Sequence, residues 1–290
     1  MKYKIAVDWG GTKTIVALIQ NNKILKKIKR MNNLKKNKIL IVNQVVHDIK
    51  LVSEGLNKKD IQGVGIGIAG AIDLKKGLVI NSPNIKFPKN FPLKKIIENK
   101  TKLKVFLEND ANVAAFGEFL YYKTKNLVGL TLGTGVGGGI IIDGKIDHGL
   151  SSAGEIGHMK ILDSGECSCG KIGCLESLVS SYGIPRIYKE LTGKNKNVFE
   201  INILADQGNK AAIKTLKQAG YYLGIGISNV INIFDPELVV LSGSIANSKI
   251  LVNEAKKIAY KNLVFRYKGK IIVSENIIEN ILLGAASLVK

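Results

Sequence analysis

The sequence predicts a two-lobed α/β protein, and three observations support this fold class. The chain has 290 residues, of which 46% are hydrophobic, and a prior of about 150 residues per domain suggests two lobes. Short apolar runs that end in glycine turns indicate strands, and they alternate with stretches of helical periodicity. One pattern of strand, glycine turn and strand also occurs twice, about one lobe apart, which indicates a duplicated architecture.

The repeated pattern covers residues 11–24 and 133–146, and each copy is fourteen residues long. Both copies open with Gly-Thr, carry an apolar strand ahead of a hairpin turn, and close with Lys-Ile. We therefore expect an N-terminal lobe over residues 1–122 and a C-terminal lobe over residues 123–277. A terminal helix at about 278–290 is expected to pack back on the first lobe.

The expected elements follow from apolar runs, helical spacing and turn residues. In the first lobe we expect strands at 5–7, 14–20, 23–29, 62–68 and 104–107, helices at 39–56 and 111–122, and a loop-rich segment at 70–92. In the second we expect strands at 127–132, 140–142, 145–146 and 237–241, a glycine turn at 133–139, and helices at 209–234, 248–262 and 280–289.

The composition limits the class of partner. The net charge is +20, and residues 1–104 alone hold 23 basic and 6 acidic side chains. Yet only Arg30, Arg186 and Arg266 are arginines, the residue that reads bases with a forked donor. We therefore expect a lysine-rich, solvated surface and no nucleic-acid partner. The absence of a signal peptide and of a long apolar run predicts a cytoplasmic protein without a membrane partner.

Residues 8–13, Asp-Trp-Gly-Gly-Thr-Lys, are expected to form a glycine turn between two strands. Consecutive glycines let backbone N–H groups approach a phosphate, and Thr12 and Lys13 add a hydroxyl and a charge. A helix does not follow, so this is neither a P-loop nor a Rossmann turn. A plain hairpin turn is the alternative.

Two further glycine turns follow expected strands. The segment 133–139 holds five glycines in seven residues, which favours close approach of a phosphate or tight packing of two strands. Residues 242–244, Ser-Gly-Ser, form the third turn. Three such turns together favour a nucleotide-binding cleft between the lobes.

Asp110 lies where an expected strand passes into a helix, and ligands bind beyond such strand ends in α/β sheets. Phosphoryl transfer from ATP needs Mg²⁺ and a carboxylate that accepts a hydroxyl proton, and Asp110 suits that base role. Asp8 suits a water-mediated hold on Mg²⁺. The alternatives are an N-cap for Asp110 and a turn residue for Asp8. Asn109 and Asn112 beside it are suited to binding hydroxyls.

The three cysteines, Cys167, Cys169 and Cys174, lie within eight residues of one another. With His158 they make a four-ligand set that is typical of a closed, structural zinc site in a reducing compartment. Three incidental buried thiols are the alternative. Glu155 and Glu176 flank this segment and would accept hydrogen bonds from sugar hydroxyls. The second ring nitrogen of His158 would donate to one.

At these residues the chain resembles the ROK family of sugar kinases and repressors, most closely its glucokinases. The resemblance rests chiefly on the segments 155–158, 167–176, 108–112 and 132–139. It implies an actin-like, ribonuclease-H-like fold of two lobes with a cleft between them, and an ATP-dependent hexose kinase that acts as a homodimer or homotetramer. Glucose is the expected substrate.

The resemblance also implies roles for single residues. Asp110 would be the general base, and the sugar would be held by Gly70, Asn84, Asn109, Glu155, His158 and Glu176. The nucleotide would be held by Gly10, Gly11, Thr12, Lys13, Thr134, Gly135 and Gly243. The chain departs from the family pattern at Trp9, at Ile68–Gly70, which lacks a proline, and at Ser242–Ser244, which replaces a run of glycines.

The sequence is compatible with two kinds of alternative function. The first is a kinase for N-acetylmannosamine, N-acetylglucosamine, fructose or allose, and residues 70–88 are expected to decide between these sugars. The second is a sugar-sensing repressor without catalysis. Family repressors carry a DNA-binding helix-turn-helix before the kinase fold, and Asp8 lies too near the start of this sequence to leave room for one.

Overall fold

The computed structural model describes residues 2–32, 37–82 and 85–290. The chain forms two compact units. Unit 1 comprises residues 1–123, 149–152 and 276–290, and unit 2 comprises residues 124–148 and 153–275. The chain passes from unit 1 to unit 2 after residue 123 and returns to unit 1 after residue 275. The expected boundaries followed residues 122 and 277. Residues 149–152 also belong to unit 1.

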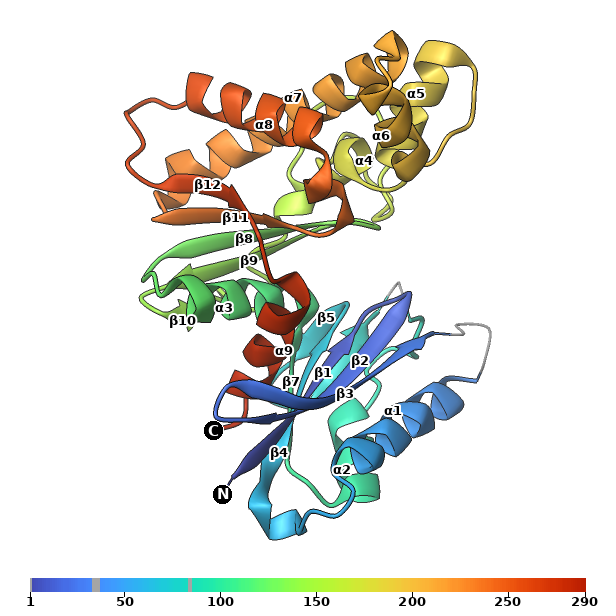
Figure 1. Ribbon diagram of the computed structural model, residues 1–290, viewed down its shortest axis with the longest axis vertical. Helices are drawn as coiled ribbons and strands as arrows, with labels where there is room; N and C mark the ends of the chain where they lie inside the picture. The colour runs from blue at the N-terminus through green and yellow to red at the C-terminus, as the bar shows by residue number, and fades with distance from the viewer. Residues whose placement is uncertain (1, 33–36, 83–84) are drawn as a thin grey trace. The chain divides into compact units, whose positions relative to one another are not determined.

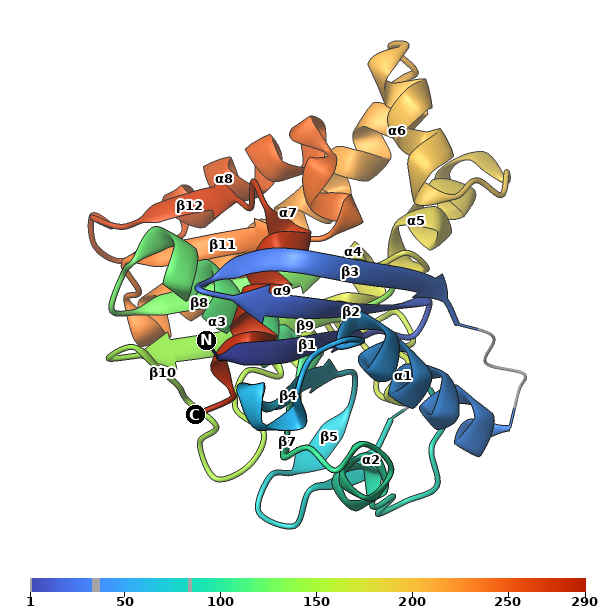
Figure 2. The same ribbon diagram turned by 60° about the horizontal axis from the view of Figure 1, so that its bottom comes forward.

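Unit 1 is built on a five-stranded sheet with the order β3-β2-β1-β4-β7 (Figure 2). Its strands are β1 (Tyr3–Trp9), β2 (Lys13–Gln20), β3 (Lys23–Met31), β4 (Ile61–Ile68) and β7 (Val105–Asn109). Its helices are α1 (Lys38–Val52), α2 (Leu93–Thr101), α3 (Asp110–Tyr122) and α9 (Ile277–Ser287), with a 3-10 turn, η1 (Lys58–Asp60). A two-stranded sheet of β5 (Ala71–Asp73) and β6 (Leu78–Asn81) completes it.

Alternation along β1 sends side chains to both faces of this sheet. Ile5 and Val7 belong to the core cluster that includes residues of α1 and α2, whereas Ala6 belongs to the cluster that includes residues of α3 and α9. Both faces are therefore covered by helices (Figure 1), which explains why the strands are apolar on both sides. Trp9 is fully buried with its ring edge-on to Phe87, at 5.7 Å between centroids.

Unit 2 repeats the plan with a sheet in the order β10-β9-β8-β11-β12. Its strands are β8 (Leu127–Leu132), β9 (Val136–Ile142), β10 (Lys145–Ile146), β11 (Leu238–Ser242) and β12 (Lys270–Val273). Its helices are α4 (Glu176–Val179), α5 (Gly183–Thr192), α6 (Val198–Asp206), α7 (Lys210–Phe234) and α8 (Lys249–Lys261), with 3-10 turns η2 (Ile156–His158) and η3 (Ser244–Asn247).

The two sheets have the same topology. In each, the first three strands form an antiparallel meander at one edge, and the next two strands continue in parallel from the first. The turn between β1 and β2 thus corresponds to the turn between β8 and β9. The α/β duplication that was predicted from residues 11–24 and 133–146 is confirmed.

Several expected elements differ from the structure. The turn predicted at 8–13 spans only residues 10–12, because Asp8 and Trp9 belong to β1 and Lys13 belongs to β2. The glycine turn predicted at 133–139 is wrong beyond residue 135, because Val136 already pairs with Leu132, and the glycines that follow it pair with β8. The segment 70–92 is not only loop, since it contains β5 and β6. We did not predict α2, α4, α5, α6 or β12. The first predicted helix ends at Val52, where Ser53 caps it, and not at residue 56.

Among the helices of the described residues, none combines the length and the apolarity that a membrane span requires.

Candidate functional site

The turn at residues 10–12 joins β1 to β2 at one end of the sheet of unit 1. The N–H of Gly10 donates to the carbonyl of Lys13 at 3.1 Å, which closes a tight hairpin. Asp8, the last but one residue of β1, lies beside Ile15 of β2 and Gly67 of β4 in the ladder. The hairpin geometry is therefore present, and the phosphate role of the turn stays a prediction.

Asp8 and Asp110 are neighbours within unit 1. Burial, together with the negative charge of Asp110, raises the pKa of Asp8 to about 6, although the positive charge of Lys13 acts in the opposite direction. Two carboxylates so close together repel each other unless a proton or a cation intervenes. The pair is therefore suited to receive a divalent cation with a polyphosphate.

The raised pKa predicts how Asp8 affects stability. Between pH 3.8 and about 6 the folded chain keeps a proton on Asp8 that the unfolded chain has lost. The free energy of unfolding therefore falls as the pH rises through this window. We expect Asp8→Asn to raise the free energy of unfolding by about 1–3 kcal/mol at pH 8 and by much less at pH 4. Urea unfolding of the ligand-free, metal-free protein at both pH values measures this, and an equal effect at both would contradict it.

Asn109, and not Asp110, is the N-cap of α3. Its side-chain oxygen accepts the N–H groups of Ala111 at 2.9 Å and Asn112 at 3.2 Å. Asp110 is the first helical residue, and its carboxylate accepts the N–H of Ala111 at 3.0 Å. The alternative that Asp110 serves only as the helix cap is therefore wrong, because Asn109 already performs that role.

The other amide groups near Asp110 are also engaged within unit 1. The side-chain amide of Asn109 donates to the carbonyl of Gly70 at 3.1 Å, which brings two residues of the predicted sugar site together. Asn112 is buried and its side-chain NH₂ group donates to the carboxylate of Glu108 at 3.0 Å, so this group supports the strand end. Asn84, a third predicted sugar ligand, lies outside the described residues.

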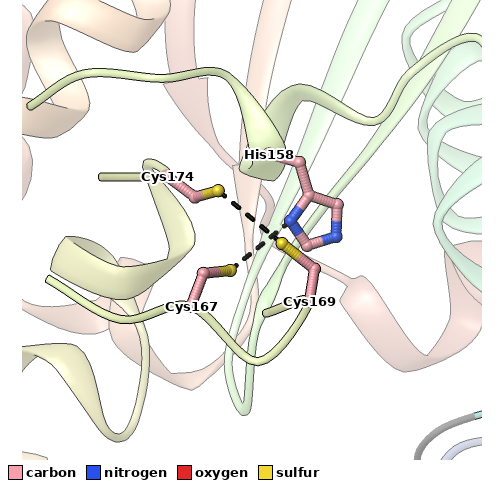
Figure 3. A group of neighbouring side chains, drawn as sticks. All are labelled: His158, Cys167, Cys169 and Cys174. Carbon is pink, nitrogen blue, oxygen red and sulfur yellow. Dashed lines mark hydrogen bonds between the residues drawn. The ribbon is translucent and has the colours of Figure 1, made fainter. Parts of the chain in front are cut away.

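The four predicted metal ligands of unit 2 converge (Figure 3). Their ligand atoms all lie within 4.8 Å of one another. Nδ1 of His158 lies 3.6 Å from Sγ of Cys167, and the sulfur atoms of Cys169 and Cys174 lie 3.8 Å apart. A hairpin brings the sulfurs together, since the N–H of Cys167 donates to the carbonyl of Lys171 at 2.8 Å.

These distances fit a tetrahedral zinc ion. Bonds of about 2.3 Å to sulfur and about 2.0–2.1 Å to nitrogen would place two sulfurs about 3.8 Å apart and a sulfur and a nitrogen about 3.6 Å apart. The two measured separations agree with both values. Cys167 and Cys174 are buried and Cys169 is exposed. Three sulfurs and one imidazole nitrogen complete the coordination shell, so the site is suited to a structural metal.

Glu176 links the metal loop to the second glycine turn. One of its carboxylate oxygens accepts the N–H of Val136 at 3.0 Å, and the other accepts the hydroxyls of Ser168 at 2.5 Å and Tyr182 at 3.0 Å. Its side chain is buried. Because both oxygens already accept internal hydrogen bonds, Glu176 holds the metal loop and the start of β9 together. Its contact with a sugar stays a prediction.

Glu155 and His158 are neighbours in the same segment, and they offer a hydrogen-bond acceptor and a donor. Nε2 of His158 lies 3.7 Å from a carboxylate oxygen of Glu155, while Nδ1 faces the sulfur of Cys167. The imidazole thus presents one nitrogen to the metal cluster and the other toward a carboxylate, an arrangement that fixes the ring. The Glu155 side chain is 61% exposed, so it remains accessible to a ligand.

The predicted nucleotide residues of unit 2 lie at the ends of β8 and β11. A side chain at Gly135 would collide with the carboxylate of Glu176, and one at Gly243, where φ is +94°, would collide with the carbonyl of Leu132. The hydroxyl of Ser181 donates to the carbonyl of Thr134 at 3.3 Å. Close packing within unit 2 therefore requires glycine at position 243 independently of any nucleotide, whereas a larger residue at position 135 would displace the carboxylate of Glu176.

Three residues that the sequence did not point to hold these segments in place. Ser168 and Tyr182 donate to Glu176, and Asn32 donates to the turn at residues 10–12. Ser168 lies between two metal ligands, which was a usable signal. Tyr182 and Asn32 had no local signal, because each contacts a segment at least six residues away in the sequence.

Comparison with known proteins places this arrangement in a family. The model of the ROK family matches residues 4–290. A glucokinase of Halalkalibacterium halodurans is 34% identical over 270 residues, which cover 85% of this chain and 82% of that protein. A xylose repressor of Caldicellulosiruptor bescii is 36% identical over 63% of this chain and 50% of the repressor.

A solved structure supports the same assignment. The ROK glucokinase of Streptomyces griseus, in complex with glucose and AMPPNP, is 28% identical and superposes with a TM-score of 0.85 over 99% of both chains. The fold is therefore the two-lobed, actin-like α/β fold, as predicted. The match over nearly the whole sequence, joined to this fold and to the His-Cys cluster, shows that the chain belongs to the ROK family.

Proposed function

We propose that this ROK protein is an ATP-dependent sugar kinase that phosphorylates a hexose hydroxyl, with glucose 6-phosphate as the product. The observation that carries the proposal is the position of Asp110 in the first turn of α3, next to Asp8. The turn at residues 10–12 follows Asp8 within the same unit. The similarity to glucokinases supports glucose as the substrate.

In this proposal Asp110 is the general base. Its carboxylate takes the proton of the attacking sugar hydroxyl while the hydroxyl oxygen forms a bond to the γ-phosphorus of ATP. The bond between that phosphorus and the β,γ-bridging oxygen breaks, and ADP leaves. Because α3 and its cap at Asn109 fix Asp110 at the strand end, the base is held in place before the sugar binds.

Two metal ions belong to the proposal. Asp8 would hold Mg²⁺ through water, and the ion would supply positive charge to the phosphate oxygens. The raised pKa of Asp8 fits this role, because a cation would relieve the unfavourable charge of the carboxylate pair. His158 and the three cysteines would hold Zn²⁺, which would shape the loop that carries Glu155 and Glu176.

Substrate binding is divided between two sets of residues. The backbone of residues 10–13, Thr134, Gly135 and Gly243 would hold the nucleotide. Gly70, Asn84, Asn109, Glu155, His158 and Glu176 would hold the sugar hydroxyls. We also propose that the enzyme acts in the cytoplasm as a homodimer or homotetramer.

A coupled ADP-release assay across a sugar panel tests the proposal. The panel contains glucose, fructose, allose, N-acetylmannosamine and N-acetylglucosamine. We expect glucose to show the highest kcat/KM, by about tenfold or more over either N-acetyl sugar. A preference for another sugar in the panel would reject glucose but keep the kinase, and the absence of ADP release with any sugar would reject the kinase itself.

A sugar-sensing regulator is the second candidate, and its support is the 36% identity to a xylose repressor. The carboxylate pair of Asp8 and Asp110 favours catalysis over sensing. A gel-shift experiment with promoter DNA at physiological salt separates the two. Binding that survives this salt, together with no turnover in the sugar panel, would favour the regulator.

A further inference from the structure

Asn32, the residue that follows β3, is hydrogen-bonded to the turn between β1 and β2. Its side-chain amide donates to the carbonyl of Gly10 at 2.7 Å and to that of Gly11 at 3.4 Å. Its backbone N–H donates to the carbonyl of Thr12 at 2.8 Å. One residue therefore contacts all three carbonyls of the turn.

These contacts determine where the N–H groups of the turn point. In a trans peptide unit the C=O and the following N–H point in opposite directions. With the carbonyls of Gly10 and Gly11 directed at Asn32, the N–H groups of Gly11 and Thr12 are directed away from it. Within the described part of the chain, neither of these N–H groups donates a hydrogen bond. The turn thus presents two unpaired donors on the side opposite Asn32.

The amide of Asn32 is itself held in one orientation. Carbonyl oxygens only accept hydrogen bonds, so the NH₂ group must face the turn. The side-chain oxygen then accepts the hydroxyl of Thr14 at 2.8 Å, and Thr14 is buried in β2. Asn32 is therefore a rigid link between the sheet and a turn that its two glycines would otherwise leave flexible.

We propose that Asn32 is a positioning residue that preorganises residues 10–12 to bind the terminal phosphates of the nucleotide. The inference rests on the proposed nucleotide role of this turn. Asn32 does not touch the nucleotide. It holds two backbone donors in the orientation that an anion needs, so that binding does not have to order the turn.

The test compares three variants by calorimetric titration with Mg-ADP, AMP and glucose. Asn32→Ala removes all side-chain contacts with the turn. Thr14→Val removes only the hydroxyl that orients Asn32. Asn43→Ala is the matched control, because Asn43 lines the same hollow of about 620 Å³ beside β3 as Asn32 and Thr14, but among the described residues no hydrogen bond joins its side chain to the turn.

We expect Asn32→Ala to raise the Kd for ADP about tenfold, as the loss of two hydrogen bonds implies. The Kd values for AMP, which lacks the terminal phosphates, and for glucose are expected to stay unchanged. Thr14→Val should produce a smaller loss of ADP affinity, and Asn43→Ala none. This pattern would not arise from a general loss of stability, which affects all three ligands alike.

An unchanged Kd for ADP in folded Asn32→Ala, or equal losses for ADP and AMP, would overturn the inference. Should Asn32→Ala fail to fold by circular dichroism, Thr14→Val decides, and unchanged ADP affinity in that variant overturns it. Failure of the proposed function looks different. In that case the wild-type protein itself binds neither ADP nor glucose, and both proposals fall together.

Discussion

Asparagine in place of Asp110 is expected to lower kcat about 10²–10⁴-fold, the usual contribution of a general base, while the affinities for sugar and ATP stay near those of the wild type. The side chains have the same shape, but an amide cannot take the proton of the sugar hydroxyl. The local fold is expected to persist, because Asn109 caps α3 and an amide oxygen can accept the N–H of Ala111 as Asp110 does. The coupled ADP assay measures kcat, and calorimetry measures the affinities.

Asp60→Asn is a suitable control for the lost charge. Asp60 precedes β4 in unit 1, at the opposite end of that strand from Gly67, which pairs with Asp8. Its replacement should leave kcat unchanged. Wild-type turnover by Asp110→Asn would show that Asp110 is not the base, even if the protein proves to be a kinase.

Removing one sulfur ligand is the change with the second largest expected effect. In Cys169→Ala the metal site keeps three of its four ligands, so we expect bound zinc to fall from about one ion per chain to little or none. Without the metal ion the loop is no longer held in one conformation, and the KM for the sugar should rise about 10–100-fold. Because Glu176 connects this loop to the N–H of Val136, the KM for ATP should rise as well.

Elemental analysis and steady-state kinetics give the two readouts separately. Ser164→Ala is the control, since Ser164 lies in the same loop but supplies no ligand to the cluster. It should keep both the zinc and the KM values. Zinc that remains bound to Cys169→Ala would refute the metal site, and zinc loss with unchanged KM values would confine the metal to a role in stability.

The departures from the family pattern show how the tertiary structure absorbs a sequence change. Trp9 stands at the end of β1, directly before the glycine turn, where the resemblance leads us to expect a small aliphatic residue. The indole is fully buried, with its ring edge-on to Phe87 of unit 1. The core therefore accommodates the larger side chain, while the N–H of Gly10 still donates to the carbonyl of Lys13 and closes the hairpin.

The sequence by itself determined the features that depend on local chemistry. Apolar runs bounded by glycines predicted the paired strands β1 and β2 and their counterparts β8 and β9, because strand pairing and tight turns leave signals within a few residues. The spacing of three cysteines predicted the metal cluster, since metal coordination demands particular ligand types in a short segment. Asp110 is a candidate from the sequence because a carboxylate at the end of a strand is itself a local signal, and its role as the base stays a prediction.

The tertiary structure alone decided which of the predicted ligand residues also hold distant segments of the protein together. Glu176 and Asn109 are both predicted to bind sugar hydroxyls, and the structure adds that Glu176 accepts a backbone N–H 40 residues away and that Asn109 caps a helix. Asn32 gave no signal at all, although it holds a turn 22 residues earlier. Such hydrogen bonds exist only after the sheets have brought distant segments together, so their partners cannot be inferred from neighbouring residues.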